Sequence, residues 1–97
     1  MKEQALFDKI DLHLIRVLNT VLTERSVSRA AMRLGMYQPA VSASLKRLRE
    51  LAGDPLLVRA GTGMAPTAVA LSLLPAADRL LQSAQAEHLR RLRQPLV

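Results

Sequence analysis

Two helical patterns separated by a three-residue turn constrain the fold of this chain more than any other feature. Residues 25–35 read RSVSRAAMRLG, and residues 36–53 read MYQPAVSASLKRLRELAG. Gly35 can adopt the left-handed conformation that ends a helix, and Pro39 suits the first turn of the next helix, where its missing N–H is no loss. The short GMY turn would hold the two helices at a steep angle. This arrangement is a helix-turn-helix pattern.

Apolar residues at helical spacing predict which faces of these helices are buried. A further helix is expected before them, over IDLHLIRVLNTVL, with Asp8 or Asp11 serving its first turn. Ser26 or Ser28 is the expected N-cap of the second helix. Because aromatic residues are almost absent, the core must be aliphatic, which favours helix packing over a sheet sandwich. The residues expected to face it are Ile10, Leu14, Val17, Leu18, Val21, Leu22, Ala30, Ala31, Leu34, Val41, Leu45, Leu48 and Ala52.

The last third of the sequence predicts a small hairpin and then a long helix. Residues 56–59 and 64–66 can form short strands joined by AGTG, because four loop residues with two glycines suit a hairpin. Thr67 is the expected N-cap of the long helix, in which Pro75 should cost about 3 kcal/mol or produce a kink. An apolar seam along this helix either folds back on its own core or needs a partner. The seam predicts a dimer interface of Ala70, Leu73, Leu74, Ala77, Leu80, Leu81 and Ala84.

Positive charge gathers in the middle of the chain. Of the formal net charge of +6, residues 25–59 carry +5, from seven basic and two acidic side chains. Such an excess is typical either of a protein that binds a polyanion or of an ordinary solvated face. There are no cysteines, and His13 and His88 lack neighbouring ligands, so we expect neither a metal nor a cofactor. No signal peptide or membrane span is expected, and the chain reads as soluble and cytoplasmic.

The motifs from residue 25 to residue 67 resemble one known family. The segment RSVSRAAMRLGMYQPAVSASLKRLRELAGDPLLVRAGTGMAPT is similar to the N-terminal winged helix-turn-helix of LysR-type transcriptional regulators. The features that match are QPAVS, PLLVR and Thr67, together with Ala30, Ala31, Leu34, Leu45, Leu48 and Gly53. The resemblance covers roughly residues 8–90, and LRELAGDPLLVR looks like the branch that includes nodulation and LeuO-like regulators.

The resemblance implies a mainly α fold: a winged helix-turn-helix of three helices and a small β-hairpin, followed by a long dimerisation helix. It divides the chain into residues 1–66, which bind DNA, and residues 67–97, the linker helix. Family members are dimers or tetramers and carry a separate C-terminal domain that binds an inducer. That domain is absent from this sequence, either because the chain is a fragment or because the natural protein is short.

Site residues also follow from the resemblance. The third helix would enter the major groove, with Gln38, Pro39, Ser42 and Ala43 reading bases and Ser28, Arg29, Lys46 and Arg49 contacting phosphates. The wing would touch the minor groove through Arg59 and Thr62, whereas Arg47 would pair with Glu50 or Glu24. Three departures matter: Tyr37 replaces a capping Ser, Ala43 replaces a base-reading Arg, and Val69 or Ala70 replaces a linker Gly.

The function that this pattern favours is a regulator that binds promoter DNA and reads an inverted repeat as a dimer, and it has two alternatives. A winged-helix module can bind protein instead, but its recognition face would then be neutral, and this one is basic. An enzyme would need a nucleophile, a base and an orienting group close together, and no such set occurs in this sequence. The sequence therefore predicts a transcriptional regulator and no catalytic residues.

Overall fold

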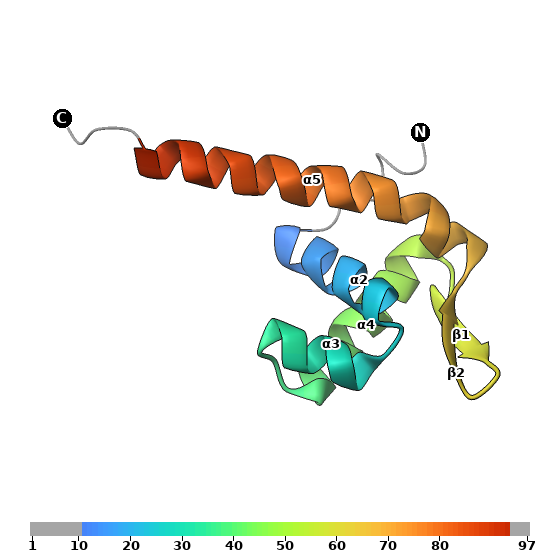
Figure 1. The fold of residues 1–97 in the computed structure, drawn as a ribbon. Helices are drawn as coiled ribbons and strands as arrows, with labels where there is room; N and C mark the ends of the chain where they lie inside the picture. Colours follow the sequence, from blue (N-terminus) through green and yellow to red (C-terminus); the bar gives the residue numbers. More distant parts are fainter. Residues whose placement is uncertain (1–10, 94–97) are drawn as a thin grey trace.

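The computed structural model describes residues 11–93, which form five segments of regular structure around a helical core and one long helix that crosses it (Figure 1). Three helices come first, then a hairpin, then the long helix, so the predicted mainly α fold is confirmed. Ile10 and Asp8 lie outside the described residues. The elements in chain order are α2 (Leu12–Glu24), α3 (Val27–Leu34), α4 (Gln38–Ala52), β1 (Leu57–Ala60), β2 (Gly63–Pro66) and α5 (Ala68–Arg93).

The ends of the helices follow from a few side chains. Asp11 caps α2 by accepting from the N–H of Leu14 at 2.9 Å, and Ser26 caps α3 by accepting from the N–H of Arg29 at 3.2 Å. Gly35 ends α3 at φ 65°, in the left-handed region where a side chain is disfavoured. The predicted role of Gly35 is thus confirmed, and of the alternative N-caps Asp11 and Ser26 are the ones used.

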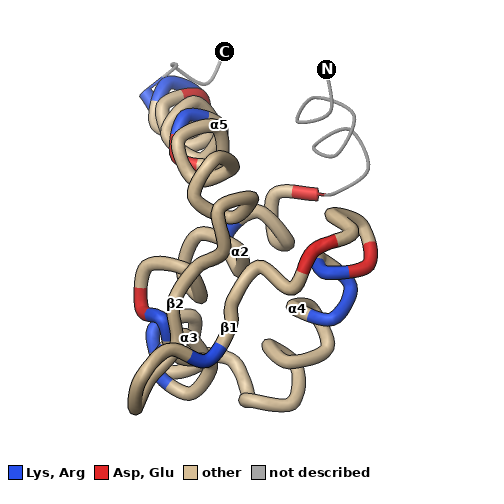
Figure 2. The backbone as a smooth tube through the Cα atoms, turned by 90° about the vertical axis from the view of Figure 1, so that its right-hand side faces the viewer, with Lys and Arg blue, Asp and Glu red and all other residues tan. Residues whose placement is uncertain are grey.

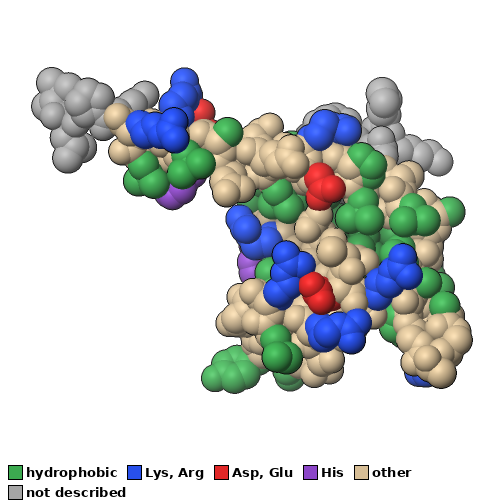
Figure 3. Space-filling view, viewed as in Figure 1, with side chains coloured by type: hydrophobic (Ala, Val, Ile, Leu, Met, Phe, Trp, Pro, Cys, Tyr) green, Lys and Arg blue, Asp and Glu red, His purple; other side chains and the backbone are tan. Residues whose placement is uncertain are grey.

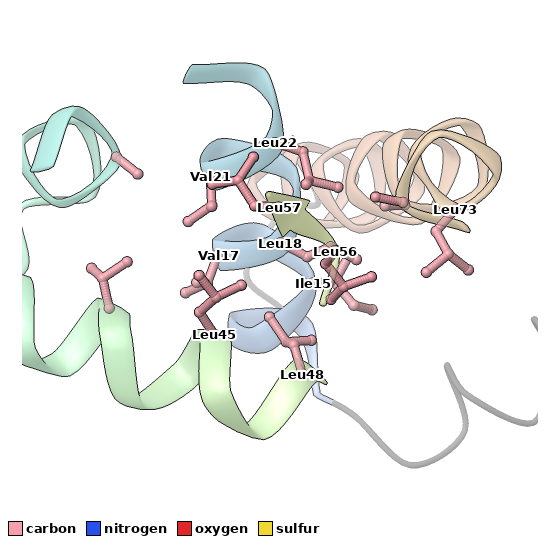
Figure 4. Close-up of a cluster of buried hydrophobic side chains, with 14 of the residues drawn as sticks. Ile15, Val17, Leu18, Val21, Leu22, Leu45, Leu48, Leu56, Leu57 and Leu73 are labelled. Atoms are coloured by element: carbon pink, nitrogen blue, oxygen red, sulfur yellow. The ribbon is translucent and has the colours of Figure 1, made fainter. Parts of the chain in front are cut away.

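The core is a single aliphatic cluster between α2, α3, α4, the start of the hairpin and the first half of α5 (Figure 4). Four residues of α2 that were predicted to face inwards, Val17, Leu18, Val21 and Leu22, are at most 2% exposed. The two adjacent alanines of α3 let α2 approach closely. The predicted core positions that are fully buried are Val17, Leu18, Val21, Leu22, Ala30, Ala31, Val41, Leu45 and Leu48; Leu14, Leu34 and Ala52 are half-buried.

The loop of the hairpin is shorter than the sequence predicted. Strands β1 and β2 pair antiparallel, with Leu57 opposite Pro66 and Ala60 opposite Gly63. Only two residues therefore form the turn, where four were expected. Gly61 stands first in this turn at φ 59°, a conformation that glycine adopts without strain. Leu56 and Leu57 are buried and attach the hairpin to the core.

Helix α5 begins as part of the domain and ends beyond it. Ala70, Leu73 and Ala77 are buried in the same cluster as α2, and Leu74 and Leu81 pack against it half-buried. The Asn19 amide nitrogen also donates to an Asp78 carboxylate oxygen, which ties α2 to α5. Of the two alternatives for the seam, folding back on its own core holds for Ala70, Leu73 and Ala77, because the first half of α5 completes the core.

The second half of α5 projects past α2 and α3 (Figure 1). Residues 82–93 have no side chain in the core cluster, and Leu89 and Leu92 are 45% and 67% exposed. Helix α5 is continuous through Pro75, so the proline does not divide it. A division of the chain at residues 66 and 67 stays a prediction, but the core itself crosses that boundary.

Candidate nucleic-acid interface

Helix α4 presents an open face opposite its buried one. Val41, Leu45 and Leu48 point into the core, as their spacing predicted. The side chains on the other side are exposed, and those at its N-terminal end carry no charge. Cations first appear in the third turn of the helix. The exposed positions of α4 are Gln38, Pro39, Ala40, Ser42, Ala43, Lys46, Arg47 and Glu50.

The N-terminal end of α4 is not capped by a side chain. Tyr37 occupies the N-cap position with extended backbone angles and forms no capping hydrogen bond, as expected for a poor cap. Its carbonyl accepts from the N–H groups of Ala40 and Val41 at 3.0 and 3.2 Å. Gln38 makes no side-chain hydrogen bond to any of residues 11–93. Its amide is therefore free to meet an external group.

Helix α3 carries two arginines whose positions are fixed by one carboxylate. The Arg33 Nη1 atom lies 2.8 Å from a Glu24 carboxylate oxygen, and the Arg29 Nε atom lies 3.7 Å from the other oxygen. Arg29 also donates to the Glu24 carbonyl at 2.7 Å. Both arginine side chains stay at least 60% exposed, so they are held in place but remain accessible. The expected pairing of Glu24 with Arg47 is wrong, because Glu24 pairs with α3.

Ser28 and Arg47 complete the exposed polar surface of this pair of helices. Ser28 lies in the first turn of α3, with its hydroxyl 3.1 Å from that of Ser26. Arg47 forms no ion pair with any residue that the structure describes, Glu50 included. Both side chains are thus open to a ligand, although only Ser28 was assigned to one from the sequence.

A compact hydrogen-bond network connects α4, the wing and α5. The Asp54 Oδ2 atom accepts from the N–H of Leu56 at 2.8 Å and from the hydroxyl of Thr67 at 2.6 Å. The Thr67 hydroxyl oxygen in turn accepts from the N–H of Ala70 at 3.1 Å, so Thr67 serves as the predicted cap of α5. Leu56 has φ 66°, which is rare for a residue with a side chain, and the turn closed by Asp54 holds it there.

Arg49 belongs to this network rather than to the open face of α4. Its Nε atom donates to the carbonyl of Pro55 at 2.8 Å, and its side chain is half-buried. The phosphate contact expected of Arg49 stays a prediction, but Arg49 is less exposed than Lys46, with which it was grouped. The bond fixes the end of α4 to the segment that begins the wing. Sequence reasoning missed both Asp54 and this role of Arg49, because neither follows from helical spacing.

The hairpin forms the wing that the sequence predicted. Arg59 is exposed on β1, opposite Met64, and Thr62 is exposed in the turn. Figure 2 shows that the Lys and Arg positions of α3, β1 and α4 all lie below α5. The basic residues at the end of α5 form a separate group, in which Arg90 and Arg91 pair with Glu87.

Within residues 11–93 the structure gives no sign of a metal centre or of a membrane segment. No three His, Cys, Asp or Glu side chains come together in a group that could hold a metal ion. None of the described helices combines the length and apolarity required to cross a bilayer.

Comparison with known proteins identifies the family. Residues 12–71 match the family described as bacterial regulatory helix-turn-helix protein, lysR family. The chain belongs to the LysR family. It is 55% identical over 64 residues to the HTH-type transcriptional activator NagR of a Ralstonia species, covering 66% of this chain and 21% of that protein. It is 44% identical over 78 residues to the HTH-type transcriptional regulator LeuO of Escherichia coli K12, covering 80% and 25%.

A solved structure supports the same assignment. The fold matches a protein chain of the structure described as the BenM_DBD/catB site 1 DNA complex, with a TM-score of 0.77 and 26% identity, over 87% of this chain and 90% of that one. This chain therefore corresponds to the DNA-binding region of the regulators of the LysR family. It spans about a fifth to a quarter of the length of NagR and LeuO. The likeness to LeuO confirms the predicted resemblance to LeuO-like regulators.

Proposed function

We propose that this chain recognises specific double-stranded promoter DNA by inserting the N-terminal end of α4 into the major groove. The observation that carries the proposal is the order of side chains along the open face of α4. Uncharged residues stand at the helix end, where base edges are read, and cations stand further along. Cations at the tip would bind phosphate indiscriminately, whereas short polar and apolar groups can distinguish bases.

Four residues at this end would read the bases. Gln38 is exposed and its amide bonds to none of residues 11–93, so it can bond to N6 and N7 of adenine. Pro39 and Ala43 are exposed beside it and can pack on the methyl group of thymine. Ser42 can donate to a base or a phosphate. Since Ala43 supplies no guanidinium, readout would favour A·T pairs over G·C pairs at these positions.

Contacts with the DNA backbone and the minor groove would come from three elements of the protein. Ser28 and Arg29 lie at the start of α3, and Lys46 lies one turn beyond Ser42 on α4. The Glu24 pairing supports Arg29 in this role, because it holds the guanidinium in place while leaving it exposed. Arg59 and Thr62 would contact the minor groove from the wing. Arg49 would contribute a phosphate contact only with the part of its guanidinium that Pro55 does not use.

A second copy of the chain would bind along α5. The lower side of the projecting half of α5 shows apolar side chains and a histidine, whereas basic side chains lie on its upper side (Figure 3). Leu80 is 38% exposed, and Leu89 and Leu92 are more so. We assign the interface to Leu80, Leu81 and Ala84 from the predicted seam, extended by Leu89 and Leu92. The buried Ala70, Leu73 and Ala77 would support the helix from beneath.

A two-fold dimer of this kind would read an inverted repeat. The symmetry of the operator mirrors that of the protein, with half-sites about one helical turn apart or a multiple of it. We place the protein in the bacterial cytoplasm, on the chromosome, because its ligand is there. Of the relatives, NagR is a transcriptional activator and LeuO a transcriptional regulator.

Binding measurements on selected and scrambled DNA test the proposal. Duplexes enriched from a random-sequence pool would be titrated with the full chain at several salt concentrations, with fluorescence anisotropy as the readout. We expect the enriched duplex to bind at least about 1,000-fold more tightly than a scrambled one, and both affinities to fall as salt rises. Equal affinity for the two duplexes at every salt concentration would show that α4 reads no bases.

A further inference from the structure

Tyr37 is the most exposed of the large apolar side chains in the described part of the chain. Its exposed fraction is 87%, and it is the one aromatic residue within residues 11–93. Its hydroxyl forms no hydrogen bond to any residue in that range. Neither packing nor polar contacts within the described domain therefore account for a large aromatic side chain at this position.

The position of Tyr37 is one where a small polar residue would stabilise the domain. Helices α2, α3 and α5 are each capped by a side chain, from Asp11, Ser26 and Thr67. Helix α4 alone among the described helices has an N-cap residue that cannot cap. A serine at residue 37 could accept from the free N–H groups of the first turn. Tyr37 forms no such capping hydrogen bond, and its phenol ring is exposed to solvent.

We propose that Tyr37 is a DNA-contacting residue whose hydroxyl donates a hydrogen bond to a phosphate oxygen beside the base pair that Gln38 reads. The inference rests on the proposed function, because it takes α4 to enter the major groove. Tyr37 directly precedes Gln38, at the end of α4 that faces the duplex. A phenol there can reach the backbone at the groove edge, and tyrosine is among the side chains that bind phosphates.

The hydroxyl differs from the cations in one measurable respect. Arg29 and Lys46 displace counterions when they bind phosphate, so their contacts weaken with salt. A neutral hydroxyl displaces none. Tyr37 therefore adds affinity without steepening the dependence of binding on salt. It also fixes how deeply α4 enters the groove, because it contacts the backbone next to the first base-reading residue.

Two substitutions separate a contact with DNA from a structural role. Tyr37→Ser introduces the missing cap and removes the phenol, whereas Tyr37→Phe keeps the ring and removes only the hydroxyl. For Tyr37→Ser we expect a melting temperature about 4–8 °C higher and binding to the enriched duplex about tenfold weaker per half-site. For Tyr37→Phe we expect an unchanged melting temperature and weaker binding, with an unchanged slope of log affinity against log salt.

The proposal requires Tyr37→Ser to raise the melting temperature and to lower the affinity for DNA. If Tyr37→Ser bound the enriched duplex as tightly as the wild type, the contact would not exist. If the Tyr37→Ser variant lost both stability and affinity, Tyr37 would have a structural role, and this result would also overturn the inference. If Tyr37→Phe bound like the wild type, the hydroxyl would not be the donor. Failure of the proposed function is distinguishable, since the wild type itself would then bind enriched and scrambled DNA alike.

Discussion

Replacing Asp54 tests how the wing and α5 are attached to the recognition helices. In the structure one carboxylate oxygen accepts two hydrogen bonds, at 2.8 Å from the Leu56 N–H and at 2.6 Å from the Thr67 hydroxyl. Asp54→Ala removes both, and it leaves the Leu56 N–H, a part-buried group, without its acceptor. It also releases the turn that holds Leu56 at φ 66°. The substitution therefore removes the side chain that connects the end of α4 to the wing and to the start of α5.

The expected magnitude follows from those two bonds. Hydrogen bonds to a charged group contribute about 1.5–3 kcal/mol each, and partial exposure reduces that value here. We expect Asp54→Ala to lower the free energy of unfolding by about 2–4 kcal/mol, a large part of the stability of a small domain. Asp54→Asn keeps an acceptor oxygen and loses only the charge, so we expect a cost of about 1 kcal/mol.

Urea unfolding followed by circular dichroism measures these differences. Glu50→Ala is the matched control, because Glu50 is an exposed carboxylate on α4 and forms no ion pair within the described residues. We expect it to change the free energy of unfolding by less than about 0.5 kcal/mol, with the same dependence on urea. An Asp54→Ala variant as stable as Glu50→Ala would refute the assignment of Asp54 as the joint of the wing.

Three further substitutions have definite expected outcomes. Gly35→Ala should cost about 1 kcal/mol of unfolding free energy because its φ is +65°, whereas Gly63→Ala, which also meets no atom within 4 Å, should be near neutral in the same urea assay. Leu89→Glu should make the chain monomeric in sedimentation at micromolar concentration. The control Ser83→Glu, on the basic side of α5, should leave the chain dimeric. A dimeric Leu89→Glu variant would contradict the proposed interface. Arg59→Ala should weaken binding to enriched and random DNA alike. The slope of log affinity against log salt concentration should become shallower by roughly 0.9 per lost phosphate contact, and by twice that in a dimer. An unchanged slope would show that Arg59 does not contact the DNA.

Periodicity was enough to predict the helices and most of the core. Val17, Val41 and Leu48 are buried because apolar residues recur at the spacing of a helix, and a helix can bury only one stripe. Gly35 and Gly53 end their helices because few other residues take a left-handed conformation cheaply. Such rules act over a few residues of sequence, so they can be read from the sequence directly.

Contacts between distant residues could not be predicted in this way. Asp54 reaches Thr67 across the hairpin, and Asn19 of α2 reaches Asp78 of α5. Spacing along one helix says nothing about such pairs. The same limit explains the error about α5, whose apolar stripe gave no indication of whether α2 or a second copy would cover it. It also explains Arg49, which was grouped with Lys46 as a phosphate contact but which donates to the carbonyl of Pro55, in the segment before the wing.

The central claim is that the N-terminal end of α4 reads bases, and Gln38→Ala tests it most directly. The side chain is exposed and bonds to none of residues 11–93, so the substitution should leave the melting temperature unchanged. That result would separate a role in DNA recognition from a role in capping the helix. The variant and the wild type should be compared on one preparation of enriched duplex and one of random duplex.

We predict that Gln38→Ala weakens binding to the enriched duplex by about 1–3 kcal/mol, relaxes the preference at one base pair per half-site, and leaves the affinity for random DNA nearly unchanged. Anisotropy titrations at fixed salt, with duplexes mutated one base pair at a time, would measure all three. Equal losses on enriched and random DNA would contradict the account, because Gln38 would then contribute to general affinity and α4 would not be the element that reads the sequence.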